Sequence, residues 1–332
     1  MNRRAFFATS AAACAASIFP AVAQTPDFAA AAAYSAERRG VSLLVMRRGE
    51  IVFEDYPNEG GAGRGWELAS GTKSFTGVMC AAAIQDGLAS WDEHAADTLT
   101  EWRGDERQRV TIRHLLSLTS GIAGGPIARP PTYADAIAQQ AGAAPGERFA
   151  YGPTPFQVFG EIMRRKTDGD PLAYLQRRIL DPLEIEPARW RRGADGMPHL
   201  PSGAALTARD WARFGWFVMR RGEGRIDARA LAECFEGSRA NPGYGLSWWL
   251  LRDGLIPPGR NAGLEIDTGL SERLGGVSMA AGAGNQRLYL VPAFELVVVR
   301  QASGILQALM GRDRGPRWSD AEFLRLVLPR PT

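Results

Sequence analysis

The chain has 332 residues, a length that suits one compact unit with two joined lobes. Hydrophobic residues make up 45% of the chain and charged residues 23%, which is typical of a globular protein with a substantial core. The formal charge of +3 excludes the strongly basic surface of a nucleic-acid-binding protein, so we expect no nucleic-acid partner.

The first 23 residues have the pattern of an export signal. Two arginines precede an apolar, alanine-rich stretch, and Ala21-Val22-Ala23 is a small-x-small cleavage site. The Arg-Arg-x-Phe-Phe order resembles a twin-arginine signal, and an ordinary secretory leader is the alternative. We expect removal of residues 1–23 and a periplasmic or secreted single domain at 24–332. No later run is apolar enough to span a membrane.

Strand patterns occur near both ends of the chain. Residues 41–46 and 51–54 flank a glycine turn and predict one hairpin, and residues 286–291 and 295–300 predict another. The last of these runs alternates weakly, which indicates a buried central strand.

The middle of the chain is mostly helical in pattern. Helices are expected at 70–85, 110–118, 133–140, 155–166, 172–179 and 208–221, with others at 27–39 and 317–328. We therefore predict an α/β fold: an antiparallel sheet from both chain termini, flanked by helices, with an inserted mostly helical lobe. The sheet lobe would comprise about 24–65 and 240–332, and the helical lobe about 66–239.

Lysine is rare in this chain. Only Lys73 and Lys166 occur among 39 basic residues, and lysine can lose its proton when buried whereas arginine cannot. Lys73 follows Ser70 by three residues, so on a helix the two share a face. A serine needs a neighbouring base to attack a carbonyl, and a lysine of lowered pKa can be that base. The pair therefore predicts a nucleophile and its activating amine; a capping serine and a solvated lysine are the alternative.

Two later segments offer partners for this pair. Tyr151 lies in a loop rich in glycine and proline and could relay a proton, although an aromatic plug between the lobes is the alternative. Around Gly282, Ala283 and Gly284, small residues would let a substrate carbonyl approach the backbone. A strand N–H there, together with that of Ser70, would form an oxyanion hole; a β-bulge or turn is the alternative.

Other residue types give little sign of additional chemistry. The three histidines are far apart and show no metal spacing, so we expect neither a metal nor an organic cofactor. Cys80 lies in a helical apolar pattern that indicates packing, and a Cys80–Cys234 bridge is an open alternative in an oxidising compartment. Whether Trp248 and Trp249 face a cleft or the core is also open.

Several short sequence motifs, which follow one another in a characteristic order, resemble those of a known family. These are Ala69–Thr76, Val110–Ile122, Pro145–Tyr151, Asp181–Leu183, Thr207–Asp210 and Gly243–Trp249. Over about residues 40 to 302 the chain resembles the serine β-lactamase-like hydrolases, which include class C β-lactamases, DD-peptidases, and esterase and amide-hydrolase relatives. The resemblance implies acyl-enzyme formation at Ser70, with Lys73 and Tyr151 as proton carriers.

Two departures from the family pattern bear on the substrate. Pro153 stands where the second motif usually has Asn, and Ala280 stands where the third usually has Lys or His. The missing cation favours a small ester or neutral amide substrate over a β-lactam. We therefore expect an exported serine hydrolase; the alternatives are a β-lactamase or DD-peptidase, and a non-catalytic module that binds a ligand or the cell wall.

Overall fold

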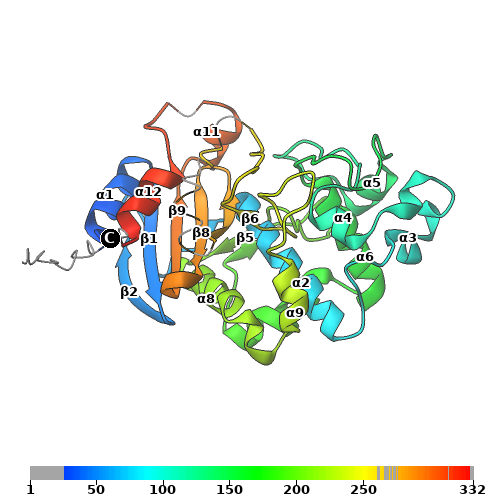
Figure 1. The fold of residues 1–332 in the computed structure, drawn as a ribbon, viewed down its shortest axis with the longest axis horizontal. Coiled ribbons are helices and arrows are strands. Elements are labelled where there is room, and N and C mark those ends of the chain that lie inside the picture. Colours follow the sequence, from blue (N-terminus) through cyan, green and yellow to red (C-terminus); the bar gives the residue numbers. More distant parts are fainter. Residues whose placement is uncertain are drawn as a thin grey trace, which may run out of the picture.

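The computed structural model describes residues 26–329 except 260, 261, 265–268, 270, 272, 273, 275 and 313. Its main feature is a six-stranded antiparallel sheet in the order β2-β1-β9-β8-β7-β6, built from both ends of the described chain (Figure 1). The strands are β1 (Gly40–Arg47), β2 (Glu50–Asp55), β6 (Trp249–Leu250), β7 (Ser278–Gly282), β8 (Gln286–Val291) and β9 (Leu296–Ala302). The predicted fold class is confirmed.

The centre of this sheet is fully buried. β9 lies between β1 and β8, and all seven of its residues are buried, as expected for the strand with weak alternation. β1 and β2 are joined by Arg48 and Gly49, both with positive φ (53° and 84°). Such two-residue loops match the twist of an antiparallel pair, which explains the predicted glycine turn.

Helices cover both faces of the sheet. Leu288 and Leu290 of β8 face α8 (Ala208–Met219), because a Cβ atom at Gly215 would lie 2.7 Å and 3.3 Å from their side chains. Tyr289, between them, stacks on Phe323 of α12 (Asp320–Val327), which packs with α1 (Phe28–Glu37). Successive strand residues point to opposite faces, so α8 and α12 lie on opposite sides of the sheet.

The second lobe is built around α2 (Lys73–Gln85), whose residues 73–83 are all buried. Around it lie α3 (Ala95–Thr98), α4 (Ile112–Leu116), α5 (Tyr133–Ala138), α6 (Thr154–Thr167), α7 (Pro171–Leu175) and α9 (Ala228–Glu233), with α11 (Ile305–Leu309) beside the main sheet. The helix expected at 110–118 is shorter, because the Thr111 side chain caps its start and Leu118 adopts a positive φ of 60°.

A small second sheet was not predicted. It has the order β3-β5-β4, with β3 (Trp66–Glu67), β4 (Arg189–Trp190) and β5 (Ala204–Leu206). Strands of two or three residues are too short to show a period of two, so no alternating pattern predicts them. This sheet matters for function because β3 leads directly into the turn that carries Ser70.

Cys80 and Cys234 are both buried free thiols in this structure. Among the described helices, none combines the length and apolar character needed to cross a membrane.

Candidate active site

Ser70 lies in a 3-10 turn (Ala69–Thr72) that runs directly into α2. The preceding residue, Ala69, has a φ of 46°, a left-handed conformation that is costly for a residue with a Cβ atom. The turn presents Ser70, which is 8% exposed, at the edge of a cleft of about 500 Å³. Local backbone strain is common where a structure fixes a reacting side chain.

Lys73 lies beneath Ser70 on the first turn of α2. Its Nζ is 3.1 Å from Ser70 Oγ and 3.2 Å from the carbonyl oxygen of Pro201. The side chain is buried, and this burial lowers the pKa of Lys73 to about 7. A large fraction of the amine is therefore neutral near neutral pH, as a base for Ser70 must be.

The carbonyl of Pro201 is held in place by Gln157 of α6. The Gln157 amide is fully buried; it donates to Pro131 O at 2.8 Å and accepts from the N–H of Leu200 at 3.3 Å. Leu200 precedes Pro201, so Gln157 fixes the loop that contacts Lys73. Sequence reasoning missed this partner, because a backbone carbonyl carries no residue-type signal.

Tyr151 is the third side chain in this cluster. Its hydroxyl hydrogen-bonds with Ser70, and burial raises its pKa to about 12. The centroid of its ring lies 5.0 Å from Lys73 Nζ and 5.5 Å from the ring of Trp249. Tyr151 is therefore a protonated phenol at neutral pH, placed to donate a proton beside Ser70.

The two adjacent tryptophans have different surroundings. Trp249 borders the cleft, whereas Trp248 is fully buried and stacks on Phe214. This settles the alternatives that the sequence left open.

β7 approaches the nucleophile turn closely at Gly282. A Cβ atom there would lie 2.1 Å from Leu68 O and 3.1 Å from the N atom of Ser70, so any side chain would collide with the turn. Ala283 and Gly284 continue along the cleft wall. The close approach brings the backbone of this strand beside the Ser70 N–H, which is the arrangement that an oxyanion hole requires.

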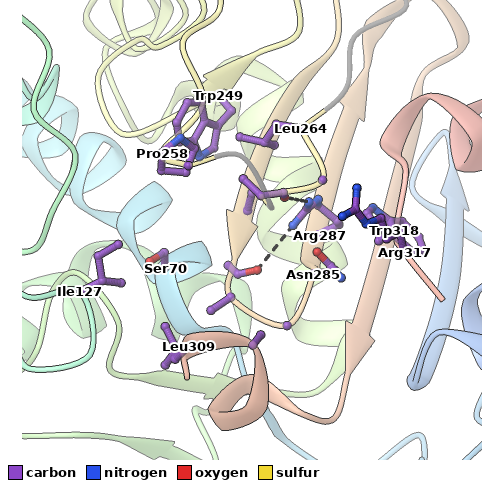
Figure 2. Close-up of a pocket in the computed structure, with 18 of the residues that line it drawn as sticks. Ser70, Ile127, Trp249, Pro258, Leu264, Asn285, Arg287, Leu309, Arg317 and Trp318 are labelled. Atoms are coloured by element: carbon purple, nitrogen blue, oxygen red, sulfur yellow. Dashed lines mark hydrogen bonds between the residues drawn. The ribbon is translucent and has the colours of Figure 1, made fainter. Parts of the chain in front are cut away.

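A buried arginine lies behind this strand. Arg287 of β8 borders the cleft and donates to both carboxylate oxygens of Asp320, at 2.8 Å and 3.2 Å. It also donates to the carbonyls of Gly282, Gln286 and Ala262, so its five N–H groups are all used (Figure 2). Arg287 therefore fixes the cleft wall, with no donor left for a ligand.

A second buried arginine, Arg300, places another positive charge beside Arg287 behind the cleft wall. Arg300 of β9 lies directly across from Arg287 in the strand register and donates to the carbonyls of Gly284 and Asn285. Burial, with the charge of Arg287, lowers the pKa of Arg300 to about 9. Both guanidinium groups thus support the hairpin that carries Gly282, Ala283 and Gly284.

The sequence-predicted residues are brought together in one place. Ser70, Tyr151, Gly282, Ala283 and Gly284 border a single cleft, and Lys73 contacts Ser70. In the described ranges, no group of three His, Cys, Asp or Glu side chains is arranged to hold a metal ion.

The family model described as Beta-lactamase matches residues 25–302. The chain belongs to the β-lactamase family. The resemblance inferred from the motifs is therefore confirmed, and with it a family of serine hydrolases.

Known relatives are distant in sequence. Protein flp of Staphylococcus aureus (strain N315) is 22% identical over 193 residues, which cover 50% of this chain and 38% of that protein. A putative β-lactamase from Bacteroides dorei matches with a TM-score of 0.69 at 18% identity, covering 84% of this chain and 91% of that one. A putative 6-aminohexanoate-dimer hydrolase from Bacillus anthracis gives 0.66 at 16% identity, covering 84% and 79%. These structural matches establish the fold.

Proposed function

We propose that this protein hydrolyses a small ester or amide through an acyl-enzyme formed at Ser70. The observation that carries the proposal is the 3.1 Å contact between Ser70 Oγ and a buried lysine amine whose pKa is lowered to about 7. A merely structural serine has no need of such a partner, and burying an amine without a carboxylate is costly.

Acylation follows from the positions of three side chains. The Lys73 amine accepts the Ser70 proton while Oγ attacks the substrate carbonyl. The N–H groups of Ser70 and Ala283 stabilise the oxyanion. Tyr151 gives its phenolic proton to the departing oxygen or nitrogen, and the ammonium of Lys73 then returns a proton to Tyr151.

Deacylation uses the same groups in reverse. A water molecule takes the place of the departed alcohol or amine and loses a proton to the Tyr151–Lys73 pair as it attacks the acyl carbon. Ser70 Oγ recovers that proton when its ester bond breaks, which leaves a free acid and the starting enzyme. Neither step calls on a cofactor.

The substrate class follows from the two departures in the motifs. Ala280 offers no cation for a substrate carboxylate, and the five N–H groups of Arg287 are all hydrogen-bonded within the protein. Pro153 offers no amide for an acylamino carbonyl. These features support an ester or neutral amide in preference to a penicillin or a cell-wall peptide.

The proposal is tested by covalent labelling and a substrate panel. A fluorophosphonate should add its mass at Ser70 of the wild-type protein and leave Ser70→Ala unlabelled. Hydrolysis rates should be compared for p-nitrophenyl esters, a neutral anilide, nitrocefin and a D-Ala-D-Ala peptide. Absence of labelling together with equal rates for wild type and Ser70→Ala on every compound would refute the proposal and favour a binding module.

We also propose that the protein acts outside the cytoplasm, as the pattern of residues 1–23 predicts. The mature chain would then begin at Gln24. Cell fractionation and intact mass of the expressed protein test this, and a full-length cytoplasmic product would contradict it.

A further inference from the structure

Two exposed apolar side chains border the cleft. In the described part of the chain, seven large hydrophobic side chains are exposed: Ile51, Val52, Ile127, Ile256, Leu306, Leu309 and Met310. Two of them, Ile127 at 40% and Leu309 at 38%, border the cleft itself. Leu306 and Met310 lie on or directly after the same helix, α11, at 59% and 54% exposure.

α11 begins beside the turn that joins β7 and β8. A Cβ atom at Gly284 would lie 3.1 Å from the Cα atom of Ile305, the first residue of α11. In Figure 2, Ile127 and Leu309 are drawn to the left of and below Ser70, whereas Trp249 and Pro258 are drawn above it. Leu309 and Ser70 therefore border the same cleft.

The proton donor orients the substrate within the cleft. Tyr151 hydrogen-bonds with Ser70 and packs at 5.5 Å on Trp249. Since Tyr151 protonates the leaving group under the proposed function, the leaving group departs toward Trp249. The acyl group then extends from Ser70 in the other direction, toward Ile127 and Leu309.

From these contacts we propose that Leu309, with Ile127, forms an acyl-binding wall that selects an aliphatic acyl chain longer than acetyl. The inference rests on the proposed function and names the acyl class of its substrate. An exposed leucine and isoleucine beside a reacting serine gain free energy only when an apolar group covers them. Pro153 adds no hydrogen-bonding side chain for a polar acyl group.

The expected preference for longer acyl chains can be calculated from the free energy of burying methylene groups. Each buried methylene corresponds to a factor of about four in kcat/KM. The wall is open on one side, so we expect about two- to fourfold per methylene and at least about tenfold between acetate and hexanoate.

The experiment measures kcat/KM for p-nitrophenyl acetate, butyrate and hexanoate below their aggregation limits. Leu309→Gln and Ile127→Gln should each lower the hexanoate-to-acetate ratio of kcat/KM at least about threefold. Ile51→Gln is the matched control: Ile51 is also 40% exposed, lies on β2 and does not border the cleft. Its ratio should equal that of the wild type.

The results that would overturn the acyl-binding wall differ from those that would overturn the proposed function. A wild type that cleaves acetate and hexanoate equally, or a Leu309→Gln variant with an unchanged ratio, overturns the acyl wall and leaves the proposed function standing. Loss of binding to phosphatidylcholine–phosphatidylglycerol vesicles in Leu309→Gln with an unchanged ratio overturns it in favour of a lipid-contacting helix. A wild type no faster than Ser70→Ala on every ester overturns both proposals.

Discussion

The burial of the Lys73 amine leads to a prediction about how the free energy of unfolding depends on pH, and this prediction needs no substrate. Its pKa is lowered from the ordinary value of 10.5 to about 7 by burial. Between these two pH values the unfolded chain binds a proton at Lys73 that the folded protein does not. The free energy of unfolding therefore rises as the pH increases from about 7 to 10.5, and it falls again as the pH is lowered toward 7.

The magnitude follows from about 1.4 kcal/mol per pKa unit. At pH 7 the lowered pKa of Lys73 reduces the free energy of unfolding by about 4 kcal/mol, relative to an amine that is neutral in both the folded and the unfolded state. At pH 9 the reduction is about 2 kcal/mol. Lys73→Met removes the titrating group and keeps a long side chain. The stability advantage of Lys73→Met over wild type should thus shrink by about 2 kcal/mol from pH 7 to pH 9.

Urea unfolding followed by tryptophan fluorescence, at half-unit steps from pH 6 to pH 9, measures this difference. Taking the difference between the two proteins cancels the titration of all other groups. The difference should flatten below about pH 7, where Lys73 is protonated in both states. Parallel curves for the two proteins over the whole range would refute the lowered pKa and, with it, the assignment of Lys73 as the base.

Three further predictions concern the groups around the pair. Tyr151→Phe should lower kcat by about 10²- to 10⁴-fold with little change in KM, measured by steady-state kinetics on an ester, because only the proton transfer is lost. Gly282→Ala should reduce both kcat and stability, the latter by about 1–3 kcal/mol in urea, because its Cβ meets the turn before Ser70, whereas Gly63→Ala has open space and should be neutral. Asp320→Asn should destabilise the protein by about 3–5 kcal/mol, because Arg287 would remain buried without its carboxylate; a melting temperature equal to wild type would contradict this.

Local spacing was sufficient for much of the fold and part of the site. The hairpins at 40–55 and 286–302 follow from apolar runs around short turns, and α6, α7 and α8 follow from helical periodicity. Ser70 and Lys73 meet because residues three apart on one helix share a face, which depends on no other part of the chain. The small residues around Gly282 predicted room for a substrate carbonyl, whereas the close packing of Gly282 on the turn before Ser70 appears only in the structure.

Contacts between distant segments decided the rest. The carbonyl that accepts from Lys73 belongs to Pro201, 128 residues away, and any residue type offers a carbonyl. The lowered pKa of Lys73 comes from burial beneath Ser70, a property of the assembled lobes. The sequence left open whether Trp248 and Trp249 face the cleft or the core, and only packing against Phe214 and Tyr151 determined which one borders the cleft.

The sequence by itself thus determined the family and the pairing of Ser70 with Lys73, because these are encoded in motif order and in a short spacing along one helix. Only the tertiary structure decided the environment of this pair. It also placed Leu309 beside Ser70, since α11 lies more than 200 residues later in the chain and reaches the cleft through the packing of Gly284 on Ile305. The burial of Lys73 and the lining of the cleft are properties of surfaces brought together by folding.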